Sequence, residues 1–70
     1  MYTLTNKDTA TVLAVGFKYG ICSYFAKDKL GNTWQCEEGY KNDMLMFREA
    51  NIPTGAWRTM DVDELYERFF

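Results

Sequence analysis

The stretch from residue 21 to residue 37 constrains the fold most, because its pattern specifies a turn and the register of the strands on either side. Asp28 suits the first position of a type I turn, where its carboxylate accepts a backbone N–H. Gly31 suits the left-handed position that closes a three-residue loop. The sequence therefore predicts a β-hairpin with residues 29–31 as its loop.

The two strands of this hairpin have distinct faces once the register is set. Counting outward from the loop in steps of two places Ala26 opposite Trp34 and Tyr24 opposite Cys36 on one apolar face. The other face of the second strand is polar and carries Thr33, Gln35 and Glu37. Such alternation is typical of a strand that is buried on one side and faces water on the other.

The cysteines bear on the cellular compartment. Cys22 and Cys36 share the apolar face in this register but lie diagonally across the strand pair, at roughly 7 to 8 Å, which is outside the usual span of a disulfide. We therefore expect two buried thiols and a reducing, cytoplasmic environment. No apolar run approaches the ~20 residues of a membrane span, and the N-terminus lacks the layout of a signal peptide, so we expect no membrane association.

The segment before the hairpin has two competing interpretations. Thr5 and Asp8 have the spacing of a capping box, which would open a helix running to Tyr19. Several β-branched residues and a glycine in mid-segment instead favour a strand over residues 11–18. In that case a second three-residue turn follows, with Gly20 in the left-handed position. We adopt the strand and keep the helix as the alternative.

Two short helices are predicted after the hairpin. Asn42 or Asp43 can cap the first, and Asp61 with Glu64 three residues later forms a capping-box variant that opens the second. The last segment also has the i, i+3, i+4, i+7 apolar stripe of a helix lying on a sheet. The predicted fold is a single α+β domain, residues 1–70, in which a three-stranded antiparallel β-meander (11–18, 21–28 and 32–38) precedes two helices (43–50 and 62–69) that pack on it.

The first two predicted strands are apolar on both sides, whereas the third is apolar on one side only. One C-terminal helix cannot cover both faces of a three-stranded sheet, so an apolar patch is left exposed. The alternative is that the helix predicted from Met44 covers that face. The candidate partner-binding residues are Leu13, Val15, Phe17, Tyr19, Ile21 and Phe25.

The chain has no histidine, which removes Ser-His and Cys-His nucleophilic sites and histidine-ligated metals. Phosphate-binding glycine loops are also missing. The acidic residues of the last helix have neither calcium-loop spacing nor a basic catalytic partner. We interpret them as the start of the helix and its solvent-exposed face. We therefore expect no enzymatic activity, no cofactor and no metal.

A small protein-binding module is the function that these features favour. It would occupy the surface of a protein partner or of a second copy in a homodimer, and a phage or mobile-element inhibitor of a host defence complex, of the anti-CRISPR or anti-restriction type, fits its size. The alternative is single-stranded nucleic-acid binding through an aromatic sheet face with lysines beside it. The net charge of −2 weighs against that alternative.

Overall fold

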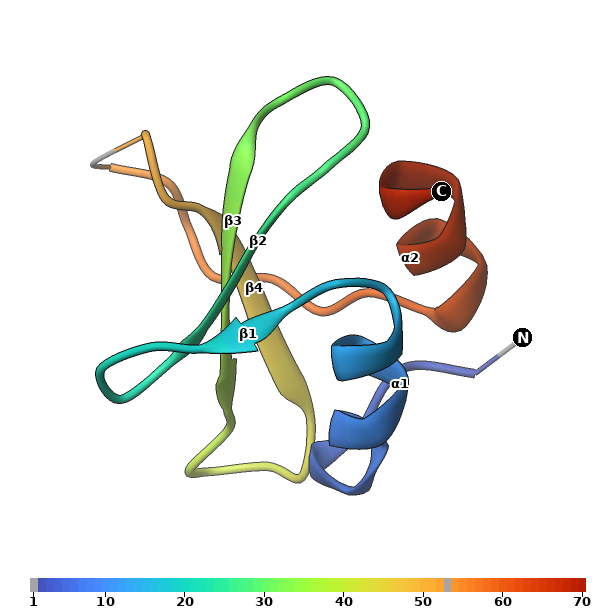
Figure 1. The fold of residues 1–70 in the computed structure, drawn as a ribbon. Coiled ribbons are helices and arrows are strands. Elements are labelled where there is room, and N and C mark those ends of the chain that lie inside the picture. The colour runs from blue at the N-terminus through green and yellow to red at the C-terminus, as the bar shows by residue number, and fades with distance from the viewer. Residues whose placement is uncertain (1, 53) are drawn as a thin grey trace.

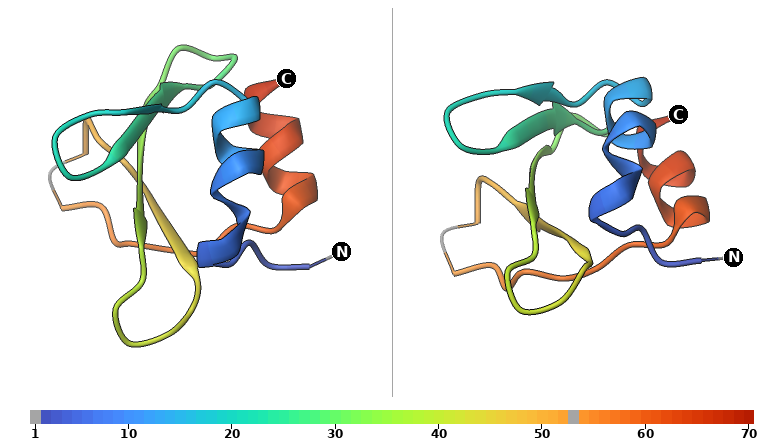
Figure 2. Two further views of the ribbon diagram at one scale, coloured as in Figure 1. Left: turned by 60° about the horizontal axis from the view of Figure 1, so that its bottom comes forward. Right: turned by 90° about the horizontal axis from the view of Figure 1, so that it is seen from below.

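The computed structural model describes residues 2–52 and 54–70. In chain order the elements are η1 (Asn6–Asp8), α1 (Thr9–Ala14), β1 (Lys18–Tyr19), β2 (Tyr24–Lys27), β3 (Thr33–Glu38), β4 (Leu45–Glu49) and α2 (Val62–Phe69). The four strands form one antiparallel sheet in the order β1-β2-β3-β4. Both α-helices lie on the same side of this sheet (Figures 1 and 2), so the α+β class is confirmed.

The predicted hairpin is confirmed with its register. Tyr24 pairs with Cys36 and Ala26 pairs with Trp34. The Asp28 N–H donates to the Asn32 carbonyl at 2.9 Å. In the loop, Gly31 has a φ of +90°, the left-handed value that its position requires.

The Asp28 carboxylate holds both the turn and the tryptophan of β3. One oxygen accepts the backbone N–H groups of Leu30 and Asn32, each at 2.9 Å. The other accepts the indole N–H of Trp34 at 2.9 Å, in a site where Asp28 is only 7% exposed. Hydrogen bonds to a charged acceptor are stronger than those between neutral groups. The Asp28 carboxylate therefore stabilises both the turn and the position of Trp34 in the core.

The prediction of a strand over residues 11–18 is wrong, because the chain is helical in α1. The capping-box alternative forms at its start, as η1 followed by α1, but the helix ends at Ala14 and does not run to Tyr19. The Thr5 N–H donates to the Asp8 carboxylate at 2.7 Å, and the Thr5 hydroxyl accepts the Lys7 N–H at 3.3 Å. These bonds satisfy backbone groups that a helix start otherwise leaves open, and they outweigh the weak strand preference of the β-branched residues.

Gly16 ends this helix and turns the chain into the core. It has a φ of +115°, and its N–H donates to the Leu13 carbonyl at 3.1 Å. The Phe17 N–H reaches back to the Val12 carbonyl at 3.3 Å. This pair of bonds is a Schellman motif, which needs a left-handed residue where Gly16 stands.

The predicted turn around Gly20 is also wrong. The first hairpin is shorter, and its turn spans residues 20–23, with Cys22 at a φ of 69°. Cys22 is therefore exposed, which corrects the prediction of two buried thiols, although both cysteines are free as predicted. The register pairs Lys18 with Phe25 and Tyr19 with Tyr24.

The helix predicted over residues 43–50 is wrong, since this segment is β4. It pairs with β3 from Trp34 opposite Glu49 to Glu38 opposite Leu45. Leu45 and Phe47 are fully buried, whereas the residues between and after them are half-buried, which is the period of a strand. The edge of β3 supplies a ladder of hydrogen bonds that outweighs the local helix signal.

The helix predicted over residues 62–69 is confirmed. The Asp61 side chain accepts the Glu64 N–H at 2.8 Å, so it is the N-cap that the sequence indicates. The Glu64 carboxylate pairs with Arg58 and, at 3.0 Å, with Arg68. The Arg68 guanidinium lies 4.9 Å from the centre of the Trp34 ring, and this cation–π contact joins α2 to the hairpin.

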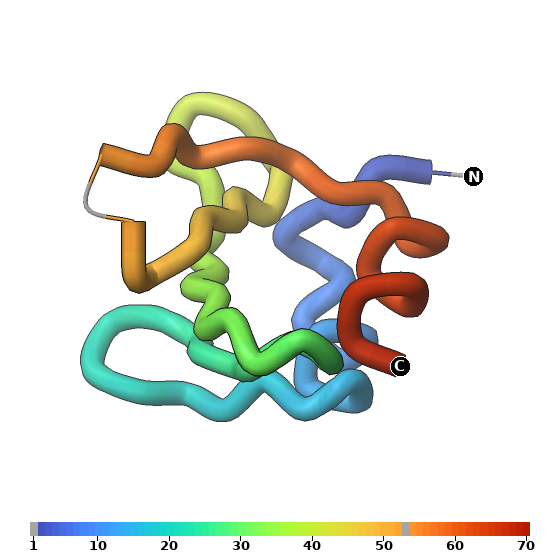
Figure 3. The backbone as a smooth tube through the Cα atoms, turned by 90° about the horizontal axis from the view of Figure 1, so that it is seen from above, coloured from blue at the N-terminus to red at the C-terminus, as the bar shows by residue number. Residues whose placement is uncertain are grey.

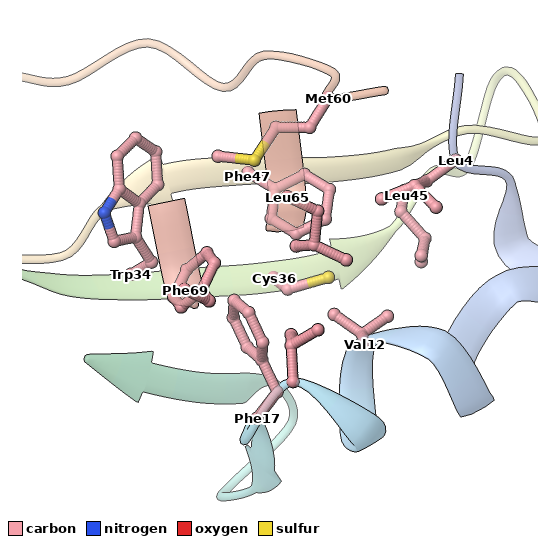
Figure 4. Packing of buried hydrophobic residues seen from close by; sticks show 11 residues of the cluster. Leu4, Val12, Phe17, Trp34, Cys36, Leu45, Phe47, Met60, Leu65 and Phe69 are labelled. Carbon is pink, nitrogen blue, oxygen red and sulfur yellow. The ribbon is translucent and has the colours of Figure 1, made fainter. Parts of the chain in front are cut away.

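The core lies between the sheet and the two helices, as Figure 4 shows. Figure 3 shows the N-terminal segment beside the chain that leads into α2, where the Leu4 N–H donates to the Met60 carbonyl at 2.9 Å. This contact closes one side of the core. The buried apolar residues are Leu4, Val12, Val15, Phe17, Trp34, Cys36, Leu45, Phe47, Met60, Leu65 and Phe69.

Replacing Asp28 with Ala should lower the free energy of unfolding by about 2 to 3 kcal/mol, because the buried Trp34 N–H loses its acceptor and the turn loses its cap. The measurement is denaturant unfolding at neutral pH. Lys29→Ala in the same loop is the control and should change the stability by less than about 0.5 kcal/mol, since its side chain is exposed. Equal effects of the two substitutions would contradict this role.

The same comparison has a pH dependence. Burial by itself raises the pKa of Asp28. The hydrogen bonds from Trp34, Asn32 and Leu30 lower the pKa by more than burial raises it, so the pKa lies below its ordinary value. Because the folded pKa is lower than the unfolded one, the ionised carboxylate stabilises the fold above about pH 4. The difference between the wild type and Asp28→Ala should therefore shrink as the pH falls below 4.

Candidate functional site

The six residues predicted as a partner-binding patch are not brought together. Val15 and Phe17 are in the core, 7% and 2% exposed, because α1 and its Schellman turn direct them inward. They cannot contribute to an exposed patch. Leu13 is 47% exposed and belongs to α1. The other three lie on the β1–β2 hairpin and are Tyr19, Ile21 and Phe25.

Three strongly exposed apolar side chains lie on or beside the β1–β2 and β3–β4 loops, and two of them, Tyr19 and Tyr40, border one hollow. Tyr19 is 68% exposed, Ile21 is 92% exposed and Tyr40 is 98% exposed. We call these three residues the loop-end surface. None of them belongs to the buried cluster, so folding does not account for their apolar character.

The β1–β2 loop is fastened to the sheet. The Gly20 N–H donates to the Ser23 carbonyl at 2.6 Å, which closes the turn that carries Ile21. The Ser23 hydroxyl donates to the Glu37 carboxylate at 2.8 Å and accepts the Gln35 amide N–H at 2.9 Å. Ser23 itself is 2% exposed, so these part-buried hydrogen bonds anchor the loop to β3.

The β3–β4 loop is fastened from the opposite side by Asn6. The Asn6 amide N–H donates to the Gly39 carbonyl at 3.2 Å, and the Asn6 side-chain oxygen accepts the Gly39 N–H at 3.1 Å. A Cβ at Gly39 would lie 2.6 Å from the Met44 carbonyl oxygen, so only glycine fits this bend. Tyr40 thus projects from a loop that two-way bonding holds in place.

The hollow between these loops has a volume of about 360 Å³. Two of its tyrosines, Tyr19 and Tyr24, meet edge to face with ring centres 5.1 Å apart. Tyr40 and two glutamates also line it. We call this feature the tyrosine hollow; it is lined by Tyr19, Cys22, Tyr24, Glu37, Glu38, Gly39 and Tyr40.

Two carboxylates, those of Glu37 and Glu38, lie at this end of β3. Burial raises the pKa of the Cys36 thiol to about 12, and the charges of Glu37 and Glu38 contribute to the same shift. Cys36 is fully buried, whereas Cys22 is exposed beside the same glutamates. A positive group entering the tyrosine hollow would therefore meet both aromatic rings and carboxylates.

The sheet face away from the helices forms a second surface, which we call the outer face. Lys18 pairs with Phe25 across β1 and β2, and Lys27 follows two residues later on the same face. On β4, Arg48 donates from Nε to the Gln35 side-chain oxygen at 3.1 Å. Its guanidinium lies 4.7 Å from the centre of the Trp57 ring, so this cation is held in one orientation.

The described residues hold no group of three or more Cys, Asp or Glu side chains placed to bind a metal ion. Within residues 2–52 and 54–70, no helix has the length and apolar character needed to cross a bilayer. Comparison of the chain with known protein families, with curated proteins and with solved structures found no match. The candidate site therefore rests on its own geometry.

Of the six predicted residues, Tyr19 and Ile21 belong to the loop-end surface, whereas Tyr24, Glu38 and Tyr40 were not predicted as part of a site. The signal for Tyr40 is the Gly39-Tyr40 pair after an acidic strand end, where a glycine bend presents an aromatic residue that no periodic pattern requires.

The two thiols should differ in reactivity. In the native protein a thiol reagent such as Ellman's reagent should modify Cys22 at pH 8 and leave Cys36 unmodified, because burial keeps Cys36 protonated and covered. In denaturant both should react. Reaction of both thiols in the folded protein, or of neither, would contradict the exposed position of Cys22.

Proposed function

We propose that this chain is a small non-enzymatic protein-binding module that uses its loop-end surface to occupy a partner's surface. The observation that carries the proposal is the exposure of Tyr19, Ile21 and Tyr40 on two loops that are each tied down by hydrogen bonds. Exposed aromatic and aliphatic side chains on a rigid support are the usual anchors of protein interfaces.

Rigid presentation matters because ordering a loop on binding costs free energy. The Ser23–Glu37 bond and the Asn6–Gly39 bonds hold the two loops before any partner arrives. Such preorganisation favours tight binding from a small contact area. This suits a domain that acts by covering a functional surface, as a phage or mobile-element inhibitor of a host defence complex, of the anti-CRISPR or anti-restriction type, would in the cytoplasm.

The test compares a double variant with a matched control in the source cell. Ile21→Ser with Tyr40→Ser removes one aliphatic and one aromatic side chain from the loop-end surface. Leu30→Ser with Tyr66→Ser removes the same kinds of side chain elsewhere, at 80% and 44% exposure. A protein that co-purifies with the wild type and the control, and not with the loop-end variant, is the expected result.

That protein should then bind the purified wild-type chain in calorimetry, with at least about tenfold loss for the loop-end variant. Circular dichroism spectra of both variants should match the wild type, since all four positions are exposed. Equal binding by the loop-end variant and the wild type would refute the proposal. Loss of binding only in the Leu30 and Tyr66 variant would refute it too.

Single-stranded nucleic-acid binding is the second candidate, and the outer face is the observation in its favour. Lys18, Phe25 and Lys27 place a ring between two cations, and Arg48 is stacked on Trp57 nearby. A labelled oligonucleotide should then bind at low salt and weaken with Phe25→Ser. No change in fluorescence anisotropy at low ionic strength would eliminate this candidate.

A further inference from the structure

We infer that the tyrosine hollow receives a positively charged side chain, arginine or lysine, from an extended segment of the protein partner. This inference rests on the proposed function and adds the chemistry of the contact. Three observations converge on it: the aromatic lining, the local negative charge and an open stretch of β3 backbone.

The lining suits a cation. Tyr19, Tyr24 and Tyr40 line an open space of about 360 Å³, which is large enough for a guanidinium or ammonium group with its aliphatic stem. The faces of aromatic rings attract cations, and several rings around one space form the aromatic cage used to bind ammonium groups. An acidic or purely apolar side chain would gain no such attraction.

Charge complementarity selects the same occupant. Glu37 and Glu38 line the hollow, which places two carboxylates beside the tyrosines. The Glu37 carboxylate is oriented by Ser23 at 2.8 Å, whereas the Glu38 side chain is exposed. A cation in the hollow would therefore have two carboxylates within its lining, one of them hydrogen-bonded and one exposed.

The backbone of β3 indicates that the cation arrives on an extended segment. β3 extends two residues beyond β2, because Tyr24, the first residue of β2, pairs with Cys36 and β3 ends at Glu38. The Gly39 N–H bonds to Met44 on the β4 side, so by alternation the Glu38 N–H and C=O point to the β2 side. The residue that would face Glu38 there is Cys22, which has a φ of 69° and lies in the turn.

Among the described residues the Glu38 N–H and C=O therefore have no backbone partner on that side. An extended peptide entering along this edge would complete the ladder at Glu38 and direct a side chain into the hollow. Addition of a peptide strand to an open sheet edge is a common recognition mode, in which side-chain pockets supply the specificity.

The test is an NMR titration with the peptide acetyl-Gly-Gly-Arg-Gly-Gly-amide. We expect saturable shifts of the Glu38 amide and of the Tyr19, Tyr24 and Tyr40 rings. The matched peptide with citrulline in place of arginine has the same shape without the charge, and it should bind at least about tenfold more weakly. Tyr40→Ala and Glu38→Gln should each weaken arginine-peptide binding, whereas Tyr66→Ala should not.

Several results would overturn the inference. They are the absence of saturable shifts, equal binding of the citrulline peptide, or shifts confined to the outer face. Concentration-dependent shifts at the hollow without any peptide would show that a second copy of the chain occupies it instead. If the loop-end variant loses its partner in cells while the arginine peptide does not bind, this inference fails and the proposed function stands.

Discussion

The bond between the Asp28 carboxylate and the Trp34 indole is the interaction on which the rest of the structure depends. A buried charge is stable only when its hydrogen bonds are made, and here the turn and the core residue share the same acceptor. The hairpin loop also contacts α2, because the Lys29 N–H donates to the Arg68 carbonyl at 2.9 Å. Arg68 then covers the Trp34 ring, so hairpin and helix support each other.

This arrangement determines which surfaces are left for a partner. Both helices pack against one side of the sheet, and the N-terminal segment closes that side (Figure 2). The loop-end surface lies outside this packing. Hydrogen bonds of Ser23 hold the β1–β2 loop, and two hydrogen bonds between Asn6 and Gly39 hold the β3–β4 loop. The exposed side chains there are consequently held by the fold without being needed for it, which is the physical basis for assigning them to recognition.

Local patterns predicted the second hairpin and the last helix well, because each is specified by short-range chemistry: a turn pair at Asp28 and Gly31, and a cap at Asp61. The other elements depended on competition that local reading does not resolve. At Gly16 a helix-ending glycine resembled a glycine in a strand, and β4 forms only because β3 offers an open edge. The hollow could not be predicted, since it joins Tyr19 of β1 and Tyr40 of the β3–β4 loop, which are distant in the sequence.

The most direct measurement of the central claim is site-specific photo-crosslinking in the source cell, with a benzophenone amino acid placed at position 40 and, in a separate protein, at position 30. Both positions are highly exposed, but only Tyr40 borders the tyrosine hollow. The account predicts that position 40 links to one protein, within a segment that contains arginine or lysine, and that position 30 does not. No specific product at position 40, or the same product from both positions, would contradict it.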